Sequence, residues 1–311
     1  MSTPVPPGTS AGPVSPPASV VIASIVGHPF LDECLRSIER EVAELGAEVI
    51  VISCGAATYM DRLRAGFPWI TLLHRPVRET VPMLRRRGVE QARGGVVAVI
   101  EEHCVAGEGW LRAALDAHAT GEYAAVGGPV ADNGYPRLVD WVVYFIEYNG
   151  SMPPAPSGCV TNLNGANIAY RREVLLAHLD RLDRGYWEVT LHPTLIERGV
   201  TLLSVPGMVV HHRGPFGFAY YLRQRYWFSR AYAGARTSSL PASRRLAYLI
   251  AAPALPLMLL VRIGARVVRD RRHIRRFAMT LPLFAPALSA LVFGEWVGYL
   301  RGPGDALTKV E

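Results

Sequence analysis

The sequence lacks the cysteine and signal patterns of several common protein classes. Its four cysteines (Cys34, Cys54, Cys104 and Cys159) lie far apart and form no Cys-x-x-Cys pair. This spacing disfavours both a zinc site and a disulfide framework, so we expect a reducing compartment. The N-terminus has no basic segment followed by an apolar run, so no secretory signal is visible.

Glycine-rich phosphate-binding loops are also missing. The turn after the first apolar run reads Ile25-Val26-Gly27-His28-Pro29, without a Gly-x-Gly-x-x-Gly or a Gly-x-x-x-x-Gly-Lys pattern. Those patterns let a backbone approach a pyrophosphate or a triphosphate closely. A dinucleotide-dependent oxidoreductase and a P-loop enzyme are therefore disfavoured.

Lysine is nearly absent, and arginine supplies most of the positive charge. With 33 Lys and Arg residues against 26 Asp and Glu residues, the chain carries a formal charge of +7. That balance suits an anionic partner, such as nucleic acid, an anionic membrane surface or a phosphorylated substrate. Because many arginines cluster beside two apolar C-terminal runs, and not on a face the size of a nucleic-acid groove, we expect no nucleic-acid partner.

Through most of the chain, short apolar runs alternate with segments whose apolar residues recur at helical spacing. Residues 1–18, rich in Pro, Ser and Gly, predict a disordered leader. The alternation that follows, with short connections, predicts a mostly parallel, doubly wound α/β sheet with covering helices. The aromatic region 141–148 is expected to be irregular. Strands are expected at 20–25, 48–53, 70–74, 96–100, 124–129, 200–205 and 208–210, and helices at 31–45, 59–65, 80–92, 110–119, from 171, and at 218–235.

The run Val96–Ile100 ends abruptly on Glu101-Glu102-His103. Its five apolar residues predict a strand buried on both faces of a parallel sheet. Ligands of open α/β sheets collect beyond the carboxyl ends of the strands, where two carboxylates and an imidazole could hold Mg²⁺ or Mn²⁺. The alternative is a polar loop that only caps the strand.

Two later segments carry further candidates. Glu188 stands beside Tyr186 and Trp187, whose rings would shield its carboxylate from water and favour a general base. The alternative for Glu188 is an acid at a helix N-terminus, stabilised by the helix dipole. Gly165-Ala166-Asn167 would let the backbone approach a ligand while an amide reads hydroxyls, although such a triplet also fits an ordinary turn.

In this order, the pieces resemble an inverting family-2 glycosyltransferase with the GT-A (nucleotide-diphospho-sugar transferase) fold, over roughly residues 20–235. Four matches carry the resemblance: Arg93-Gly94-Gly95; Glu101-Glu102-His103 followed by Gly109-Trp110-Leu111; Gly165–Arg172; and Trp187-Glu188 with 195–199 and 206–212. Glu101-Glu102-His103 stands where the family has Asp-x-Asp. Glu188 stands where it has an acidic pair, and Ser53-Cys54-Gly55 replaces an Asp that helps to hold the nucleoside.

The resemblance also implies roles for particular residues. Glu188 would be the catalytic base that deprotonates the acceptor hydroxyl. The donor would be bound by Ala23, Ser24, Ser53, Arg87, Glu101 and Glu102, and its diphosphate by Arg225 and Arg230. The acceptor sugar would be bound by Gly165, Ala166, Asn167 and Trp187. A divalent metal, Mg²⁺ or Mn²⁺, would be held by Glu102, His103 and His211, or by the neighbouring His212 in place of His211.

Two apolar segments close the chain, at 246–261 and 277–300. The sequence therefore divides into a GT-A domain at 19–236 and a membrane-associated helical region at 237–311. The second segment exceeds the roughly 20 residues that a bilayer span needs, and predicts a transmembrane helix. The first carries Pro253 and Pro256 and predicts an interfacial or re-entrant helix over about 246–268.

The basic segment 269–276 between them bears on topology. With a single span, this segment and the catalytic domain both face the cytoplasm, where sugar nucleotides are made, and the arginines lie against anionic lipid. The sequence thus predicts a metal-assisted enzyme of the cell envelope, at the cell membrane. It would move a sugar from a nucleotide-sugar donor to a lipid-linked or membrane-proximal glycan. The alternative is a non-catalytic, membrane-anchored nucleotide-sugar or glycan-binding protein that retains the fold.

Overall fold

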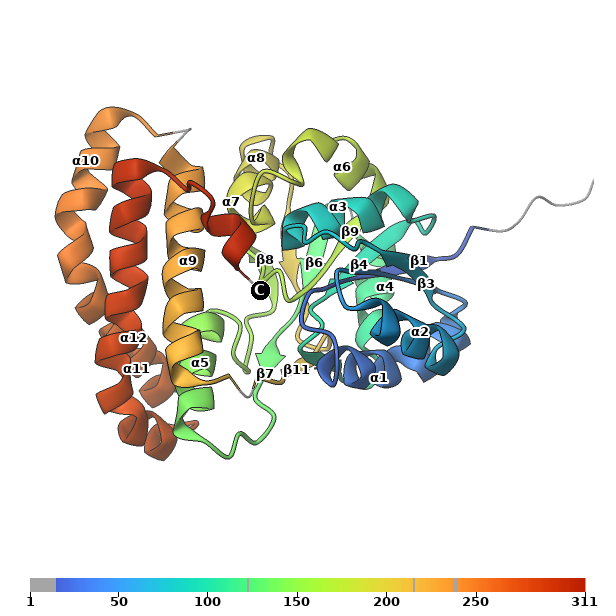
Figure 1. Ribbon diagram of the computed structural model, residues 1–311, viewed down its shortest axis with the longest axis horizontal. Coiled ribbons are helices and arrows are strands. Elements are labelled where there is room, and N and C mark those ends of the chain that lie inside the picture. Colours follow the sequence, from blue (N-terminus) through green and yellow to red (C-terminus); the bar gives the residue numbers. More distant parts are fainter. Residues whose placement is uncertain (1–14, 122, 215, 238–239, 311) are drawn as a thin grey trace, which may run out of the picture.

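The computed structural model describes residues 15–121, 123–214, 216–237 and 240–310. The chain forms an α/β domain with a layer of long helices beside it (Figure 1). Residues 1–14 of the predicted leader lie outside the described residues. Ala18, the last residue of the predicted leader, already belongs to the first strand.

An eight-stranded sheet forms the centre of the α/β domain. Its strands are β1 (Ala18–Ser24), β2 (Glu48–Ser53), β3 (Thr71–His74), β4 (Val96–Ile100), β6 (Ala125–Gly127), β8 (Gly158–Val160), β9 (Asn167–Arg171) and β10 (Leu202–Ser204), in the order β3-β2-β1-β4-β9-β6-β10-β8. The first four strands pair in parallel, and β9 runs antiparallel between β4 and β6. The mostly parallel α/β sheet confirms the predicted fold class.

Side chains of β1 alternate between two hydrophobic cores. Val20 and Ile22 pack into the core that lies under α1 (Phe30–Leu45), whereas Val21 packs into the core under α3 (Val81–Gln91). This alternation is the two-residue period of a strand covered on both faces. Helix α3 begins as predicted, because the Thr80 hydroxyl accepts a hydrogen bond from the Met83 amide at 3.3 Å. Helices α2 (Ala57–Gly66), α4 (Trp110–Thr120), α6 (Arg172–Leu176), α7 (Trp187–Thr190) and α8 (His192–Glu197) also belong to this domain.

A second sheet of three strands stands at the end of β4. Its strands are β5 (Cys104–Ala106), β7 (Val130–Ala131) and β11 (Val210–His212), in the order β5-β11-β7. We predicted that a strand ends before His211 and His212, which is wrong, since both histidines lie within β11. Antiparallel pairing with β5 extends the strand to His212, opposite Cys104.

Two segments differ from the sequence expectation. Residues 141–148, expected to be irregular, belong to helix α5 (Leu138–Tyr148), because Trp141, Tyr144, Phe145 and Tyr148 form one buried helical stripe. Strand β9 was not expected after Gly165-Ala166. Its first residue is a buried Asn, a residue type that is rare in strands, but here tertiary hydrogen bonds satisfy the amide.

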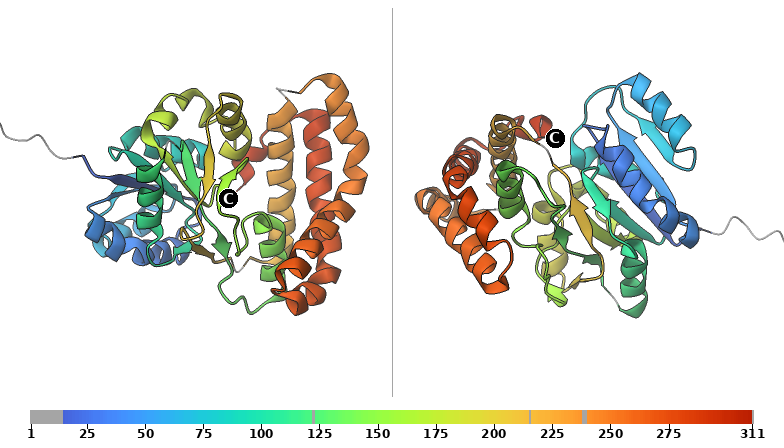
Figure 2. Two further views of the ribbon diagram at one scale, coloured as in Figure 1. Left: turned by 180° about the vertical axis from the view of Figure 1, so that it is seen from behind. Right: turned by 90° about the horizontal axis from the view of Figure 1, so that it is seen from below.

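Four helices form the layer beside the α/β domain: α9 (Phe218–Thr237), α10 (Ala242–Ala251), α11 (Leu255–Asp270) and α12 (Ile274–Arg301). They run side by side, and α12 lies between α9 and the other two (Figures 1 and 2). A short 3-10 turn, Ala252–Ala254, joins α10 to α11. Two helical stretches, Ala242–Asp270 and Ile274–Arg301, are long and apolar enough to cross a membrane.

Glycines bring the backbones of α9 and α12 close together. A Cβ atom on Gly294 would lie 2.3 Å from the Tyr226 carbonyl oxygen, and one on Gly298 would lie 2.6 Å from that of Arg230. Only glycine fits at such distances, because both neighbours are main-chain atoms. This seam attaches the last long helix directly to α9, the helix of the layer that lies nearest the α/β domain (Figure 1).

We expect Gly298→Ala to lower the free energy of unfolding by about 1–3 kcal/mol, because the added methyl group must push α12 away from α9. Chemical denaturation of the purified protein measures the change. Gly264→Ala in α11 is the matched control, since its Cβ would lie 3.4 Å from the Phe277 ring, an ordinary contact. The control should be neutral or stabilising by up to ~1 kcal/mol. Equal effects of the two substitutions would contradict the close seam.

Candidate functional site

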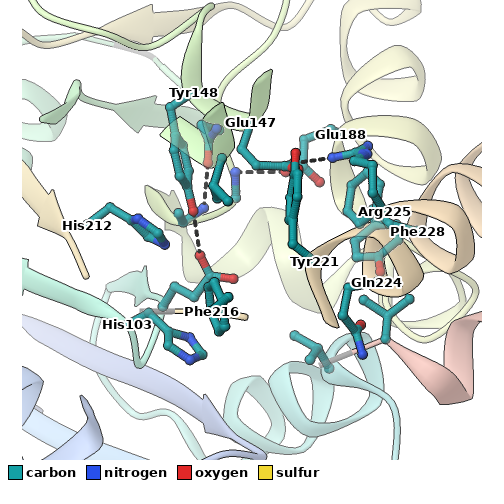
Figure 3. A pocket seen from close by; sticks show the side chains of 18 of the residues that line it. His103, Glu147, Tyr148, Glu188, His212, Phe216, Tyr221, Gln224, Arg225 and Phe228 are labelled. Carbon is teal, nitrogen blue, oxygen red and sulfur yellow. Dashed lines mark hydrogen bonds and ion pairs between the residues drawn. The ribbon is translucent and has the colours of Figure 1, made fainter. Parts of the chain in front are cut away.

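A cavity of 190 Å³ lies between the end of β4 and helices α5 and α9 (Figure 3). Several ionisable side chains converge on it from separate elements of the chain. They are Arg85, Glu101, His103, Glu147, Glu188, and Arg225. The cavity thus joins the end of β4 to residues more than a hundred positions later in the sequence.

The two adjacent acids after β4 have different environments. Glu102 is only 4% exposed, and its carboxylate accepts four hydrogen bonds from the loop after β1. The donors are the Ser24 hydroxyl at 2.8 Å and the amides of Ile25 at 2.9 Å, Val26 at 2.9 Å and Gly27 at 2.8 Å. Glu102 therefore holds this loop and does not line the cavity, contrary to its predicted role as a metal ligand.

Glu101 is the acid of this pair that faces the cavity. Its Oε2 accepts a long hydrogen bond, 3.4 Å, from the Tyr148 hydroxyl, and its amide donates to the Ala166 carbonyl at 3.1 Å. The second contact ties the end of β4 to the loop that precedes β9. Glu101 is thus the carboxylate that the end of β4 offers to a ligand.

Two histidines line the same part of the cavity. His103 packs against Phe30 and Phe216, with ring centroids 4.7 and 5.3 Å away, and its Nε2 is buried without a partner among the described residues. Burial, and the neighbouring His103, lower the pKa of His212 to about 3, so that its ring is neutral. The Tyr135 hydroxyl donates to the His212 carbonyl at 2.9 Å and lies 3.0 Å from Nδ1.

The structure does not bring together the metal ligands that the sequence predicted. His211 does not line the cavity, and its Nδ1 lies 3.0 Å from the Asp132 carbonyl oxygen. Within the described ranges, no three His, Cys, Asp or Glu side chains converge as a metal-binding group. The cavity does offer the Glu101 carboxylate and the unpartnered Nε2 of His103. These two groups fit a divalent cation that brings further oxygen ligands of its own.

Glu188 lies on the opposite wall of the cavity, at the start of α7. Its Oε1 accepts a hydrogen bond from the Gly165 amide at 2.7 Å, whereas its buried Oε2 has no partner among the described residues. A Cβ atom on Gly165 would lie 2.5 Å from that Oε1 and 3.1 Å from Arg85 Nη1. The glycine therefore allows the close approach, and one carboxylate oxygen remains free for a ligand.

Sequence reasoning missed Arg85 and named Arg87 instead. Arg85 is 6% exposed and lines the cavity, while Arg87 lies in an ion pair with Glu79, at 2.5 Å. The helical spacing of α3 turns Arg85 toward the sheet, together with Leu84 and Val89. The sequence did contain a signal for this: of the three arginines 85 to 87, Arg85 shares the buried helical stripe with Leu84 and Val89.

Arg225 reaches the cavity from α9 and forms a buried ion pair with Glu147 of α5. The Tyr221 hydroxyl donates to the same carboxylate at 3.0 Å. Arg230, also predicted to bind the diphosphate, lies elsewhere: its Nε points to the Gly302 carbonyl at 3.4 Å, and its guanidinium lies over the Trp227 ring. Of the two arginines, only Arg225 is positioned at the cavity.

Two residues predicted to contact the acceptor sugar are packing residues in this structure. Trp187 is 2% exposed, and its indole donates to the Leu182 carbonyl at 2.9 Å. Asn167 is fully buried and donates to the carbonyls of Pro129, at 3.1 Å, and Met208, at 2.6 Å. Gly165 and Ala166 do line the cavity.

The predicted donor residues at the ends of β1 and β2 lie outside this cavity. Ala23, Ser24 and Ser53 are buried, and the Ser53 hydroxyl lies 3.4 Å from that of Ser24. They stand beside the loop that Glu102 holds, at the same edge of the sheet as Glu101.

If Glu102 is a structural anchor, Glu102→Gln should lower the free energy of unfolding on the order of 2–4 kcal/mol. The substitution removes the charge and turns an NH₂ group toward N–H donors. Glu101→Gln is the matched control, since Glu101 is partly exposed and has one long side-chain hydrogen bond. We expect it to change stability by less than about 1 kcal/mol. Denaturant titration measures the free energy of unfolding of both variants. Equal losses would contradict the role of Glu102 as a structural anchor.

Comparison with solved structures finds similarity to glycosyltransferases. A mannosyltransferase from Pyrobaculum calidifontis, PcManGT, in complex with GDP-Man and Mn²⁺, aligns at a TM-score of 0.56 and 16% identity, over 93% of this chain and 88% of the other. TarS from S. aureus, in complex with UDP-GlcNAc, aligns at 0.49 and 11% identity, over 92% of each chain. No curated protein matches by sequence.

The sequence itself matches a family profile described as "Glycosyl transferase family 2", over residues 19–178. The matched region spans more than half of the 311 residues and includes β1, the acids after β4, and Gly165. It includes three of the four matches behind the resemblance and ends shortly before the fourth, which begins at Trp187. With the GT-A-like sheet described above, this match shows that the chain belongs to glycosyl transferase family 2.

Proposed function

We propose that this glycosyltransferase moves a sugar, with inversion, from a nucleotide-sugar donor to a hydroxyl of a lipid-linked or membrane-proximal glycan. The observation that carries the proposal is the Glu188 carboxylate, which is held by the Gly165 amide through one oxygen and has its other oxygen unpartnered beside the cavity. The Glu188 carboxylate is therefore already in position to accept a proton before the acceptor binds.

The residues suggest a single displacement. Glu188 Oε2 accepts the proton of the acceptor hydroxyl while the acceptor oxygen bonds to the anomeric carbon and the bond to the diphosphate breaks. Negative charge then develops on the leaving diphosphate. The guanidinium groups of Arg85 and Arg225 reach the cavity and would stabilise that charge.

The nucleoside would lie at the ends of β1 and β2, near Ser24 and Ser53. Glu102 keeps the intervening loop, Ile25 to Gly27, in a fixed conformation through its hydrogen bonds. A fixed loop reduces the entropy lost when the nucleoside binds.

For the metal, we propose Glu101 and His103 as protein ligands, in place of the predicted Glu102 and His211. PcManGT, which shares the fold, was solved with Mn²⁺. A cation held there would supply positive charge to the donor diphosphate. His103 is held in place by Phe30 and Phe216 on either side, which suits a ligand of fixed position.

A non-catalytic, membrane-anchored protein that binds nucleotide sugars or glycans remains the alternative, since it would keep the same cavity. Turnover separates the two functions. We expect Glu188→Gln to lower turnover on the order of 10²–10⁴-fold while donor binding persists, because the amide keeps the shape and loses the basicity. Nucleotide release across a panel of sugar nucleotides and acceptors gives the measurement.

Asp180→Asn is the matched control, because Asp180 is exposed and pairs only with Arg184 among its described contacts. The control should retain wild-type turnover. Wild-type turnover in Glu188→Gln would contradict the base assignment. A wild-type protein that binds a sugar nucleotide and never releases the nucleotide would instead favour the non-catalytic alternative.

The helical layer supports membrane association. Of the large apolar side chains exposed in the described part of the chain, all but three lie on α10, α11 and α12. Leu257, Met258 and Val261 of α11 are 67%, 62% and 62% exposed. Exposed arginines stand near them, at positions 244, 262, 269, 271, 272, 275, 276 and 301. Apolar groups next to guanidinium groups suit an anionic lipid surface.

We infer that this layer lies along the membrane surface, instead of crossing it as the sequence predicted for 277–300. Helix α12 packs along α9, and Arg225 of α9 reaches into the cavity. If α12 spanned the bilayer, α9 and its arginines would enter the hydrocarbon as well, at high cost. The catalytic domain would face the cytoplasm, where nucleotide sugars are available.

We expect the triple variant Leu257→Glu, Met258→Glu and Val261→Glu to lower partition onto anionic phosphatidylglycerol vesicles at least tenfold. Each substitution replaces an exposed apolar group that would otherwise be buried in lipid. Vesicle sedimentation measures the bound fraction. The control places three glutamates on α2, at the exposed positions Ala57, Thr58 and Ala65. Since α2 lies on the far side of the α/β domain (Figure 1), a similar loss in the control would contradict a dedicated surface.

A further inference from the structure

A second cavity, of 620 Å³, adjoins the first. The two share part of their walls, including Glu147, Glu188, Arg225 and Phe228. Residues of strand β8 and of helix α9 line the second cavity beside Glu188. Arg262 of α11 also lines it. Glu188 therefore stands at the junction of the two spaces.

A hydrogen-bond chain fixes the orientation of one amide in the wall of the second cavity. His192 Nε2 lies 2.7 Å from the Tyr170 hydroxyl, and its Nδ1 lies 2.8 Å from Asn162 Oδ1. Burial lowers the pKa of His192 to about 4, so the ring is neutral and carries one proton. Because an amide oxygen can only accept, that proton lies on Nδ1 and Tyr170 donates to Nε2. The amide oxygen of Asn162 is thus engaged, which leaves its NH₂ group for a ligand.

An aromatic surface lines the same cavity from α9. Phe228 and Tyr232, one helical turn apart, have ring centroids 6.1 Å apart and planes 20° from parallel. Tyr186 packs against Phe228 at 4.4 Å, and the Arg225 guanidinium lies 4.3 Å from the centre of the Phe228 ring. These two contacts hold Phe228 in place, so a ligand would stack at the Tyr232 end of this surface. Sugar rings bury their C–H faces on aromatic rings of this kind, while amides and hydroxyls bind the sugar's hydroxyl groups.

We infer that the second cavity is the acceptor subsite, which binds a sugar ring between the Phe228–Tyr232 surface and the Asn162 amide. The inference rests on the proposed function. It assigns the acceptor to residues other than Asn167 and Trp187, which are buried. A donor in the first cavity and an acceptor in the second would meet at Glu188. Because Arg262 belongs to the helical layer, the subsite lies next to the surface proposed to contact the membrane.

The test is direct binding of carbohydrate probes to the full-length protein. The probes are methyl glycosides of glucose, mannose, galactose and N-acetylglucosamine in solution, and the matching dodecyl glycosides in lipid nanodiscs. Saturation-transfer NMR measures the methyl glycosides, and calorimetry measures the dodecyl glycosides. Tighter binding of the dodecyl series would identify a membrane-held glycan, and equal binding would identify a soluble one.

We expect at least one glycoside to bind, and Tyr232→Leu and Asn162→Asp each to weaken that binding tenfold or more. Asn162→Asp keeps the oxygen that accepts from His192 and removes the NH₂ donor. The matched control is Trp227→Leu, because Trp227 is on the same helix and lines neither cavity. The Trp227→Leu variant should bind the glycoside with an affinity within twofold of that of the wild-type protein.

Two results would overturn the subsite: no glycoside binds the wild-type protein, or both variants bind as tightly as wild type. Sugar-nucleotide binding, measured on the same samples, tests the proposed function separately. A protein that binds the glycoside through Tyr232 and Asn162 but binds no sugar nucleotide would overturn the proposed function and leave the carbohydrate site standing.

Discussion

The four hydrogen bonds to the buried Glu102 carboxylate join the end of β4 to the loop after β1. A carboxylate at this depth is stable only when its oxygens are satisfied, and here three backbone amides and a hydroxyl satisfy them. With Glu102 held in this way, Glu101 faces the cavity and His103 lies between two aromatic rings. The position of the candidate ligands thus follows from one buried carboxylate.

Helix α9 connects the other parts of the molecule. One side carries Arg225, Phe228 and Tyr232 to the two cavities, and the other packs against α12 through close glycine contacts. The exposed apolar residues of α10 to α12 lie beyond that seam. The surface proposed to contact lipid is therefore separated from the first cavity by only one or two helices, an arrangement that would suit an acceptor held at a membrane.

Much of the fold could be predicted because its signals are local. The buried strands, the Thr80 cap and the alternation of strand and helix depend on residues a few positions apart, and the structure confirms them. Helix α5 was missed although the helical spacing of its aromatic residues was visible in the sequence. Strand β9 could not be predicted from its own residues, since partners from distant segments satisfy Asn167.

By itself, the sequence determined the α/β class, the place of an acidic motif at the end of β4, and the apolar character of the C-terminal helices. Each of these depends on the local period and composition of the chain. Only the tertiary structure decided that Glu101 and not Glu102 faces the cavity, and that Trp187 is buried. Adjacent side chains of a strand or loop point in different directions. Which of them meets a partner depends on contacts such as that of Ser24 with Glu102, between residues 78 positions apart.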